Sequence, residues 1–279
     1  MLSKIDVRVV LAGFLLLVMG CSKDAPLIPQ IDNQSAVVTS IKLNQKGYAA
    51  VSLDSLILEV IGEGVTRIRK ELIIDGTKAQ TQIQVPVDEK LRMEVTGYQD
   101  STAVLFGSQE FMAQKGETVP VEINLDFMVS TIILSPPDSS LKTGEQIAIH
   151  LAARKVLEMS TFGVLVHFDP TRLQVVELQR EDDFLTSNSG SVMPMEFTKD
   201  NVAGTVKIIL GIFPASAGVS GTGDIGKIVF EAIASDTTDI SIQVDNRQNS
   251  DLGLFDKSAN LIYSVGLGSR LFIQQNSEL

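Results

Sequence analysis

Apolar and polar residues alternate with a period of two along most of the chain after residue 35. Successive side chains of a β-strand point to opposite faces, so this pattern predicts strands that each bury one face. Turn residues recur at short intervals between the alternating segments, and no long amphipathic helix pattern interrupts them. The sequence therefore predicts an all-β chain whose strands form two β-sandwiches.

The first sandwich is expected over residues 36–128. Asp75-Gly76 marks a hairpin turn there, because glycine adopts the positive φ that tight hairpins require. The unit resembles, in a general way, the immunoglobulin-like modules of bacterial lipoproteins. Its expected strands are SLILEVIG, TRIRKELII, TQIQVPV, KLRMEVTGY, AVLFGSQEF and TVPVEINL. The boundary with the second unit, residues 129–279, falls near LDFMVSTIILSPPDSS.

The N-terminus combines two basic residues, Lys4 and Arg8, with an apolar run of 12 residues from Val9 to Gly20. A membrane-spanning helix needs about 20 apolar residues. The run is shorter than that, so residues 1–20 are predicted to be a secretory signal peptide.

The signal peptide ends in Val18-Met19-Gly20-Cys21, which resembles the bacterial lipobox. The resemblance implies lipid attachment at Cys21, the single cysteine of the chain. Residues 21–35 then form a polar, proline-containing tether. We expect an exported protein that a lipid anchors to the cell envelope, in the outer membrane. Ser22 and the Lys23-Asp24 pair favour that membrane and its outer surface.

The charge and cysteine content exclude several classes of function. The formal net charge is −11, and no basic stripe of the kind that binds phosphates is present, so we expect no nucleic-acid partner. One cysteine allows neither an intrachain disulfide nor a cysteine metal cluster.

A glycine-rich segment, Gly221 to Lys227, matches two nucleotide-binding patterns. Both patterns require a loop that opens a helix, whose N-terminal N–H groups bind the phosphate. Here the strand-like IVFEAIA follows, and Ile228 replaces the serine or threonine of a P-loop. We interpret the segment as a turn.

His167 and Asp169 flank Phe168, but no nucleophile-elbow sequence accompanies them. On strand parity Val164, Val166 and Phe168 face the core, which leaves His167 half-exposed. Asp169-Pro170 is predicted to form a turn through the fixed φ of proline and the capping side chain of aspartate. No catalytic residue is expected.

Two acidic groups are candidates for calcium. Glu181, Asp182 and Asp183 lack the alternating spacing of a calcium loop, so a solvated loop is expected there. A structural calcium ion at Asp245, Asp251 and Asp256 is an alternative that the sequence leaves open. Otherwise we expect no cofactor and no metal.

Segments of the second unit together resemble a cohesin domain. They are LKTGEQIAIHLAARKV, FGVLVHFDPTRLQVVELQREDDFL, GTVKIILGIF, GVSGTGDIGKIVFEAIA and TDISIQV, in that order over residues 131–275. The resemblance implies a nine-stranded jelly-roll sandwich related to certain cellulose-binding modules. It also implies that the chain binds dockerin modules through one sheet face, which includes the strand carrying HFDP.

Strand alternation suggests which residues share that face. Thr161 and Gly163 stand where the best-known cohesins carry amide and acidic side chains. The candidate partner-binding residues are Thr161, Gly163, Leu165, His167, Lys207, Ile209, Ser241 and Gln243.

Two functions of different classes follow. The first is a surface lipoprotein whose cohesin-like module binds a protein partner, of dockerin type or in a cell-surface assembly. The alternative is a carbohydrate-binding module in polysaccharide utilisation. Sugar platforms generally use exposed aromatic faces, and the chain has no Trp and three Tyr, so protein binding is favoured over an enzyme or a glycan binder.

Overall fold

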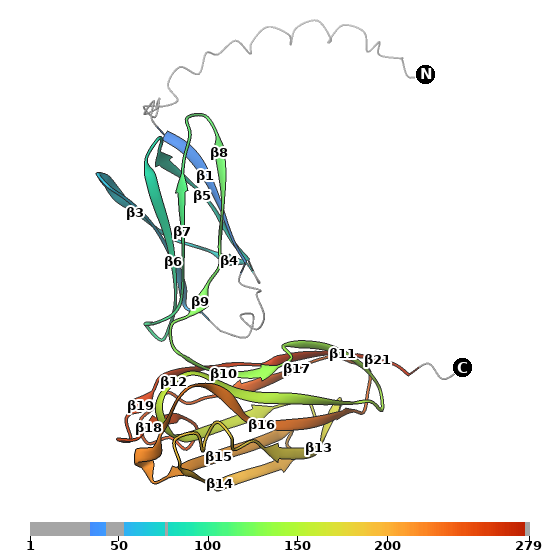
Figure 1. Cartoon of the computed structure of the whole chain (residues 1–279). Helices are drawn as coiled ribbons and strands as arrows, with labels where there is room; N and C mark the ends of the chain where they lie inside the picture. Colours follow the sequence, from blue (N-terminus) through green and yellow to red (C-terminus); the bar gives the residue numbers. More distant parts are fainter. Residues whose placement is uncertain (1–33, 43–52, 76–77, 277–279) are drawn as a thin grey trace, which may run out of the picture.

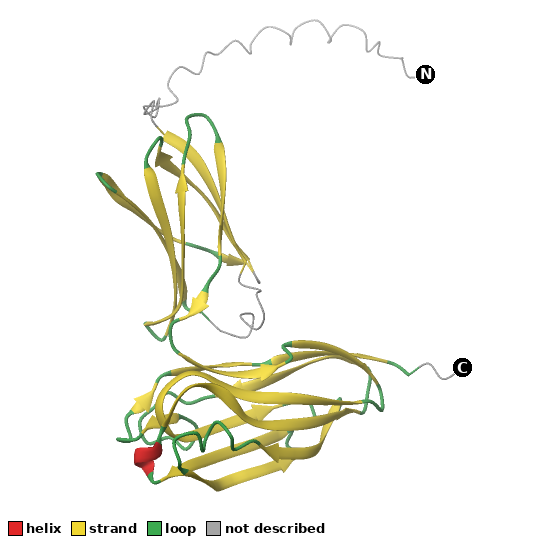
Figure 2. Ribbon diagram, in the orientation of Figure 1, coloured by secondary structure: helices red, strands yellow, loops and turns green. Residues whose placement is uncertain are grey.

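The computed structural model describes residues 34–42, 53–75 and 78–276. Strands make up most of these residues, and a 3₁₀ turn, η2 (Ala215–Ala217), is the one helical element among them (Figure 2). Within these ranges, no helix combines the length and hydropathy that crossing a membrane requires. The all-β fold class is confirmed. The predicted signal peptide, Cys21 and most of the predicted tether lie outside the described residues.

The N-terminal strands form two sheets that face each other (Figure 1). One sheet has the order β4-β5-β1-β8 and the other β3-β2-β6-β7-β9. The strands are β1 (Gln34–Lys42), β2 (Ser55–Gly62), β3 (Val65–Glu71), β4 (Ile74–Asp75), β5 (Lys78–Pro86), β6 (Lys90–Gln99), β7 (Thr102–Met112), β8 (Thr118–Ile123) and β9 (Asp126–Phe127).

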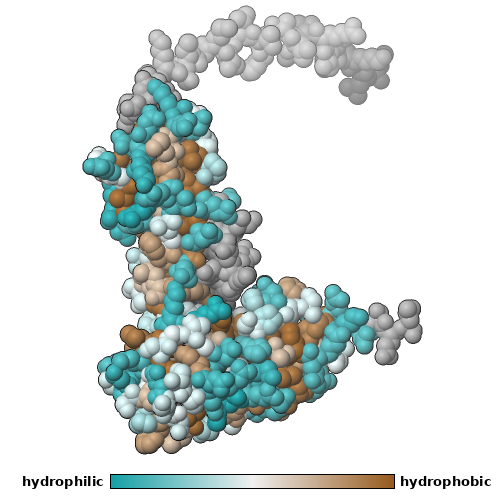
Figure 3. All heavy atoms as spheres, viewed as in Figure 1, coloured by the Kyte–Doolittle hydropathy of each residue, from teal (hydrophilic) through white to brown (hydrophobic). Residues whose placement is uncertain are grey.

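The period-two pattern decides what this sandwich buries. Hydrophilic residues cover much of the outer surface that Figure 3 shows. Leu56, Leu58 and Val60 alternate along β2 and are fully buried, whereas the residues between them are partly exposed. Asp75 pairs with Lys78, so β4 and β5 form the predicted hairpin around residues 76–77, which lie outside the described residues. β1 and β2 lie in different sheets, whereas the first two strands of an immunoglobulin domain share one. The strand order is therefore not that of an immunoglobulin.

The C-terminal strands form a second sandwich. They are β10 (Ser130–Ser135), β11 (Asp138–Lys142), β12 (Gln146–His167), β13 (Leu173–Arg180), β14 (Ser191–Asp200), β15 (Thr205–Phe213), β16 (Val219–Ala232), β17 (Asp236–Gln243), β18 (Leu254–Asp256), β19 (Leu261–Ile262), β20 (Ser264–Leu267) and β21 (Ser269–Gln274). The expected nine strands correspond to β10, the two halves of β12, β13 to β17, and a last strand divided into β20 and β21.

β12 is a continuous strand of 22 residues that belongs to both layers. Its first half pairs with β10 and β16. β10 also pairs with β20, and β16 also pairs with β13. Its second half pairs with β15 and β17, and β14 pairs with β15. Val164, Val166 and Phe168 point into the core between the layers, as strand parity predicted.

The glycine-rich segment is not the turn that the sequence suggested. Residues 221–226 lie inside β16, which pairs with β12 through several register shifts. Neighbouring atoms leave no room for a side chain at two of these glycines. A Cβ on Gly226 would lie 2.7 Å from the Gln179 carbonyl oxygen, and a Cβ on Gly223 would collide with the Phe184 ring. The glycines thus permit close packing of β13 and its following loop on β16.

The two sandwiches share an apolar contact where β9 leads into β10 (Figure 1). Ile133, Ala152, Val265 and Leu267 of the C-terminal unit pack in the same cluster as the N-terminal core. Polar bonds surround this contact. The Lys155 ammonium lies 2.8 Å from Asp126 Oδ2 and 2.7 Å from the Phe127 carbonyl oxygen, and the Tyr263 hydroxyl donates to the Gln99 carbonyl oxygen at 3.3 Å.

Candidate functional site

The outer surface of β17, the second half of β12, β15 and β14 forms the candidate site, which we call the β12–β15 face. Leu165 lies between Lys207 of β15 and Gln243 of β17 in the strand register. His167 lies between Thr205 and Ser241. This layer is distinct from the β10 side, where the N-terminal sandwich packs.

The register places all eight sequence-predicted residues on this one side of the layer. Those with exposed surface are Thr161, Leu165, His167, Lys207, Ser241 and Gln243. Ile209 is 9% exposed and contributes little surface. Their role in binding a partner stays a prediction.

Gly163 is buried, so it cannot be a contact residue as we expected. Its backbone N–H donates to the Gly253 carbonyl oxygen at 2.9 Å. A Cβ at this position would collide with the Asp251 carbonyl oxygen. The segment before β18 therefore covers the face at Gly163, and a side chain there would displace it. Sequence parity alone does not reveal this cover, because the covering segment is distant in the sequence.

Two pairs of polar side chains connect neighbouring strands of the face. The Lys207 ammonium lies 2.8 Å from Glu196 Oε2, and this hydrogen bond raises the pKa of Lys207 above its ordinary value. His167 Nε2 lies 3.1 Å from Gln243 Oε1. The face thus presents polar side chains fixed by neighbouring strands rather than a cluster of like charges.

Three exposed apolar side chains lie at one end of the face, and the sequence analysis missed them. Met193 and Met195 of β14 are 56% and 58% exposed, and Phe213 of β15 is 65% exposed. Met193 pairs with Gly211, and the Met195 methyl carbon would lie 3.6 Å from a Cβ on Gly211. Met193 and Met195 are two positions apart and lie on the same side of β14. A bulge between Pro194 and Glu196 brings Glu196 to that side as well, where it forms the ion pair with Lys207.

Asp169 completes a turn and not a catalytic pair with His167. Its Oδ1 accepts hydrogen bonds from the Thr171 N–H at 2.8 Å and the Thr171 hydroxyl at 2.7 Å. The Thr171 hydroxyl and N–H, with Arg172, lower the pKa of Asp169 below its ordinary value. The predicted Asp-Pro turn is confirmed.

Two of the three aspartates that were candidates for calcium have other partners. Asp245 binds the Arg247 guanidinium through both oxygens and accepts a hydrogen bond from Ser250, which together lower its pKa to about 2. Asp256 accepts hydrogen bonds from Ser258 and Asn260 in a tight turn. Asp251 is exposed.

The segment Arg180-Glu181-Asp182-Asp183, which begins at the last residue of β13, is divided between two environments. Arg180 holds Asp182 in a bidentate ion pair at 2.6 and 2.8 Å, which fixes the start of the loop after β13. Asp183 is exposed, as expected for a solvated loop. Glu181 departs from that expectation, because its Oε1 lies 3.9 Å from Nδ1 of His150, which belongs to β12 in the same layer.

The cohesin domain model matches residues 132–254. A search of curated proteins found no match.

Similar solved structures include a non-cellulosomal cohesin from the archaeon Archaeoglobus fulgidus, with 12% identity over 53% of this chain and 94% of that one, and a TM-score of 0.41. A type II cohesin domain from the cellulosome of Acetivibrio cellulolyticus has 16% identity over 51% and 95%, with a TM-score of 0.42. A cohesin–dockerin complex from Clostridium thermocellum has 14% identity over 52% and 99%, also at 0.42.

The family match begins in β10 and ends at the start of β18, so it spans both halves of β12 and the whole β12–β15 face. Of the two motifs that suggested the family, HFDP lies at the end of β12 and IVFEA lies within β16, and each contributes a phenylalanine to the core. Residues 132–254, in the C-terminal part of this chain, are a cohesin domain.

Proposed function

We propose that this chain is a lipid-anchored envelope protein whose cohesin domain binds a dockerin-type protein module through the β12–β15 face. Cohesin domains are non-catalytic protein-binding modules, and the family match supports that role here. In the proposal, Cys21 carries the lipid, residues 21–35 form the tether, and the outer membrane presents the two sandwiches.

One observation carries the choice of face. Met193, Met195 and Phe213 expose apolar surface on the β12–β15 face, whereas the N-terminal sandwich covers apolar residues of the β10 side. Exposed apolar side chains that gather on one surface mark interaction sites. Methionine is flexible and polarizable, so it adapts to a partner's shape.

The chemistry of the face suits a helical partner. Leu165 and the exposed methionines offer apolar contacts to the apolar side of an amphipathic helix. The ion-paired Lys207 and Glu196, with Gln243 and Ser241, supply polar groups beside them. The other outer layer is partly occupied, since Ala152 and Ile133 pack against the N-terminal sandwich.

The binding test uses purified dockerin modules encoded in the genome of the parent organism, titrated into the full chain by calorimetry with calcium present. We expect one module to bind with one-to-one stoichiometry. Met193→Asp combined with Met195→Asp should weaken that binding at least about tenfold, because each change places a charge against an apolar partner surface.

Ile73→Asp is the matched control. Ile73 is an apolar side chain of the N-terminal sandwich with 86% exposure, so the same substitution there should leave the affinity unchanged. Equal affinity of the methionine variant and the wild type would contradict the assignment of the face. Specific binding on a glycan array with no bound dockerin would instead favour the carbohydrate-binding alternative.

The anchor is tested separately. Cys21→Ser should move the protein from the membrane fraction to the soluble exported fraction, because lipid attachment requires the thiol. Retention of this variant in the membrane would contradict lipidation and leave the binding proposal unaffected.

A further inference from the structure

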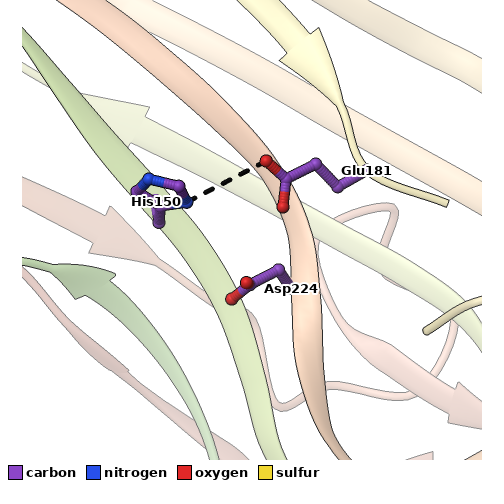
Figure 4. A group of neighbouring side chains, drawn as sticks. All are labelled: His150, Glu181 and Asp224. Atoms are coloured by element: carbon purple, nitrogen blue, oxygen red, sulfur yellow. Dashed lines mark ion pairs between the residues drawn. The ribbon is translucent and has the colours of Figure 1, made fainter. Parts of the chain in front are cut away.

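Three potential metal ligands meet on the β10 side of the cohesin domain, away from the β12–β15 face. His150 belongs to β12, Asp224 to β16, and Glu181 follows β13 directly. Figure 4 shows the imidazole and both carboxylates directed toward a common space. One ligand atom of each residue lies within 4.8 Å of the other two, and no second group of three His, Cys, Asp or Glu within the described ranges meets this condition.

The pairing of β12 and β13 with β16 brings the three residues together. Leu151, next to His150, pairs with Gly226, and Arg180, next to Glu181, pairs with the same glycine from the other side. The Glu181 N–H donates to the Ile225 carbonyl oxygen at 3.0 Å. β16 is therefore the central strand of the group, with β12 and β13 on its two edges.

A bulge in β16 turns Asp224 toward His150. The register between β12 and β16 shifts after Leu151–Gly226, so that Ala152 pairs with Asp224. Ile225, the additional residue, is fully buried, and Asp224 is exposed on the surface that carries His150. Bulges of this kind redirect a side chain, often beside functional sites.

The distances are close to those of a metal site. His150 Nδ1 and Glu181 Oε1 are 3.9 Å apart. Zinc bonds of about 2.0–2.2 Å to nitrogen and oxygen hold tetrahedral ligand atoms about 3.4 Å apart. A small rotation of the partly exposed glutamate closes this difference.

The charge around the group favours a cation. Two carboxylates face the space, and in the described part of the chain Asp224 forms no ion pair. The nearest basic residues along the chain do not neutralise them: Arg180 is held by Asp182, and Lys227, opposite His150 in the register, forms no ion pair with either carboxylate among the described residues.

We propose that His150, Glu181 and Asp224 bind a divalent transition-metal cation of the zinc class. The imidazole nitrogen selects zinc and its neighbours, whereas sites for calcium and magnesium use oxygen ligands. Three protein ligands leave a position for water on the exposed side. The bound ion connects β12, β16 and the loop after β13, two residues along β12 from Ala152 and the contact with the N-terminal sandwich.

The test is calorimetric titration of Zn²⁺ into the full chain, produced without a polyhistidine tag and with Cys21→Ser to remove the single thiol. We expect one Zn²⁺ per chain and a rise in melting temperature. His150→Ala should weaken binding at least about tenfold, and Glu181→Gln and Asp224→Asn should each weaken it.

His167→Ala is the matched control, because His167 is the other histidine of the chain and bonds to Gln243 instead of a carboxylate. Its zinc affinity should equal that of the wild type, and Ca²⁺ or Mg²⁺ should give no response that depends on His150. Circular dichroism without metal checks that each variant is folded. Absence of stoichiometric zinc binding, or equal losses in His150→Ala and His167→Ala, would overturn the proposal.

Discussion

The rings of Phe168 and Phe230 meet edge to face, with their centroids 5.3 Å apart and their planes at 72°. Phe168 follows the end of β12, and Phe230 lies in β16, so the pair joins the two layers of the cohesin domain. Both rings are buried. The HFDP and IVFEA motifs, which are 62 residues apart in the sequence at these phenylalanines, therefore meet through the same contact.

Phe230→Ala should destabilise the cohesin domain by about 3–5 kcal/mol, because it removes a fully buried ring and leaves a cavity. Phe213→Ala provides the control: its ring is exposed, and the substitution should change the free energy of unfolding by less than about 0.5 kcal/mol. Guanidinium unfolding followed by circular dichroism measures both. Similar losses in the two variants would contradict the packing described.

Gly163→Ala should cost about 1–3 kcal/mol of stability, since the new methyl group collides with the Asp251 carbonyl and forces the covering segment away. Gly211→Ala is matched to it on the paired strand, where the nearest side-chain atom is 3.6 Å from the new Cβ. Thermal unfolding should show a loss for Gly163→Ala and almost none for Gly211→Ala. A tolerated Gly163→Ala would mean that the Asp251 segment does not cover the face.

Asp245 should make stability depend on acidity between about pH 4 and pH 2. Its pKa falls from 3.8 to about 2 in the folded chain because Arg247 and Ser250 hydrogen-bond to the carboxylate. A carboxyl group with a lowered folded pKa stabilises the fold above its unfolded pKa and loses that contribution as the pH falls through its folded pKa. The melting temperature of Asp245→Asn should therefore be lower than that of the wild type at neutral pH, and the difference should disappear as the pH approaches 2.

Arg247→Gln tests the cause of that pH dependence. Without the guanidinium, the pKa of Asp245 should return toward its ordinary value, and the melting temperature should depend less on pH over the same range. The melting temperatures of the wild type, Asp245→Asn and Arg247→Gln, measured at several values from pH 7 to pH 2, test this expectation. An unchanged pH dependence in Arg247→Gln would assign the shift to other groups.

Ala152→Asp should loosen the contact between the two sandwiches, because it places a charge in the apolar cluster that they share. Ala148→Asp introduces the same charge on the same face of β12, at an exposed position. Small-angle scattering should show a larger radius of gyration for Ala152→Asp than for the wild type, whereas Ala148→Asp should match the wild type. Identical scattering from both variants would indicate that this contact does not hold the sandwiches together.

Strand alternation predicted the features that depend on local periodicity. It predicted the core positions of Val164, Val166 and Phe168, and it placed Leu165 and Lys207 on one side of a layer. These predictions succeeded because β12 and β15 pair without a register shift between residues 161 and 167. Regular pairing lets a period of two carry across neighbouring strands.

The features that alternation missed lie at register shifts or under distant segments. The bulge at Met195 brings Glu196 to the face of Met193, and the bulge at Ile225 brings Asp224 to the face of His150, so neither position follows from parity. Gly163 is covered by residues that lie about ninety positions away along the chain. A single sequence does not specify such bulges, because an inserted residue looks like any other.

The shared strand β12 gives the proposed function a mechanical consequence. Leu165, on the face assigned to the partner, and Ala152, beneath the N-terminal sandwich, belong to one unbroken strand. Tension between a bound partner and an anchored cell would run along this backbone through both layers, supported by the hydrogen bonds of five neighbouring strands. Because both layers share this backbone, a pull on one layer is transmitted to the other through the chain itself.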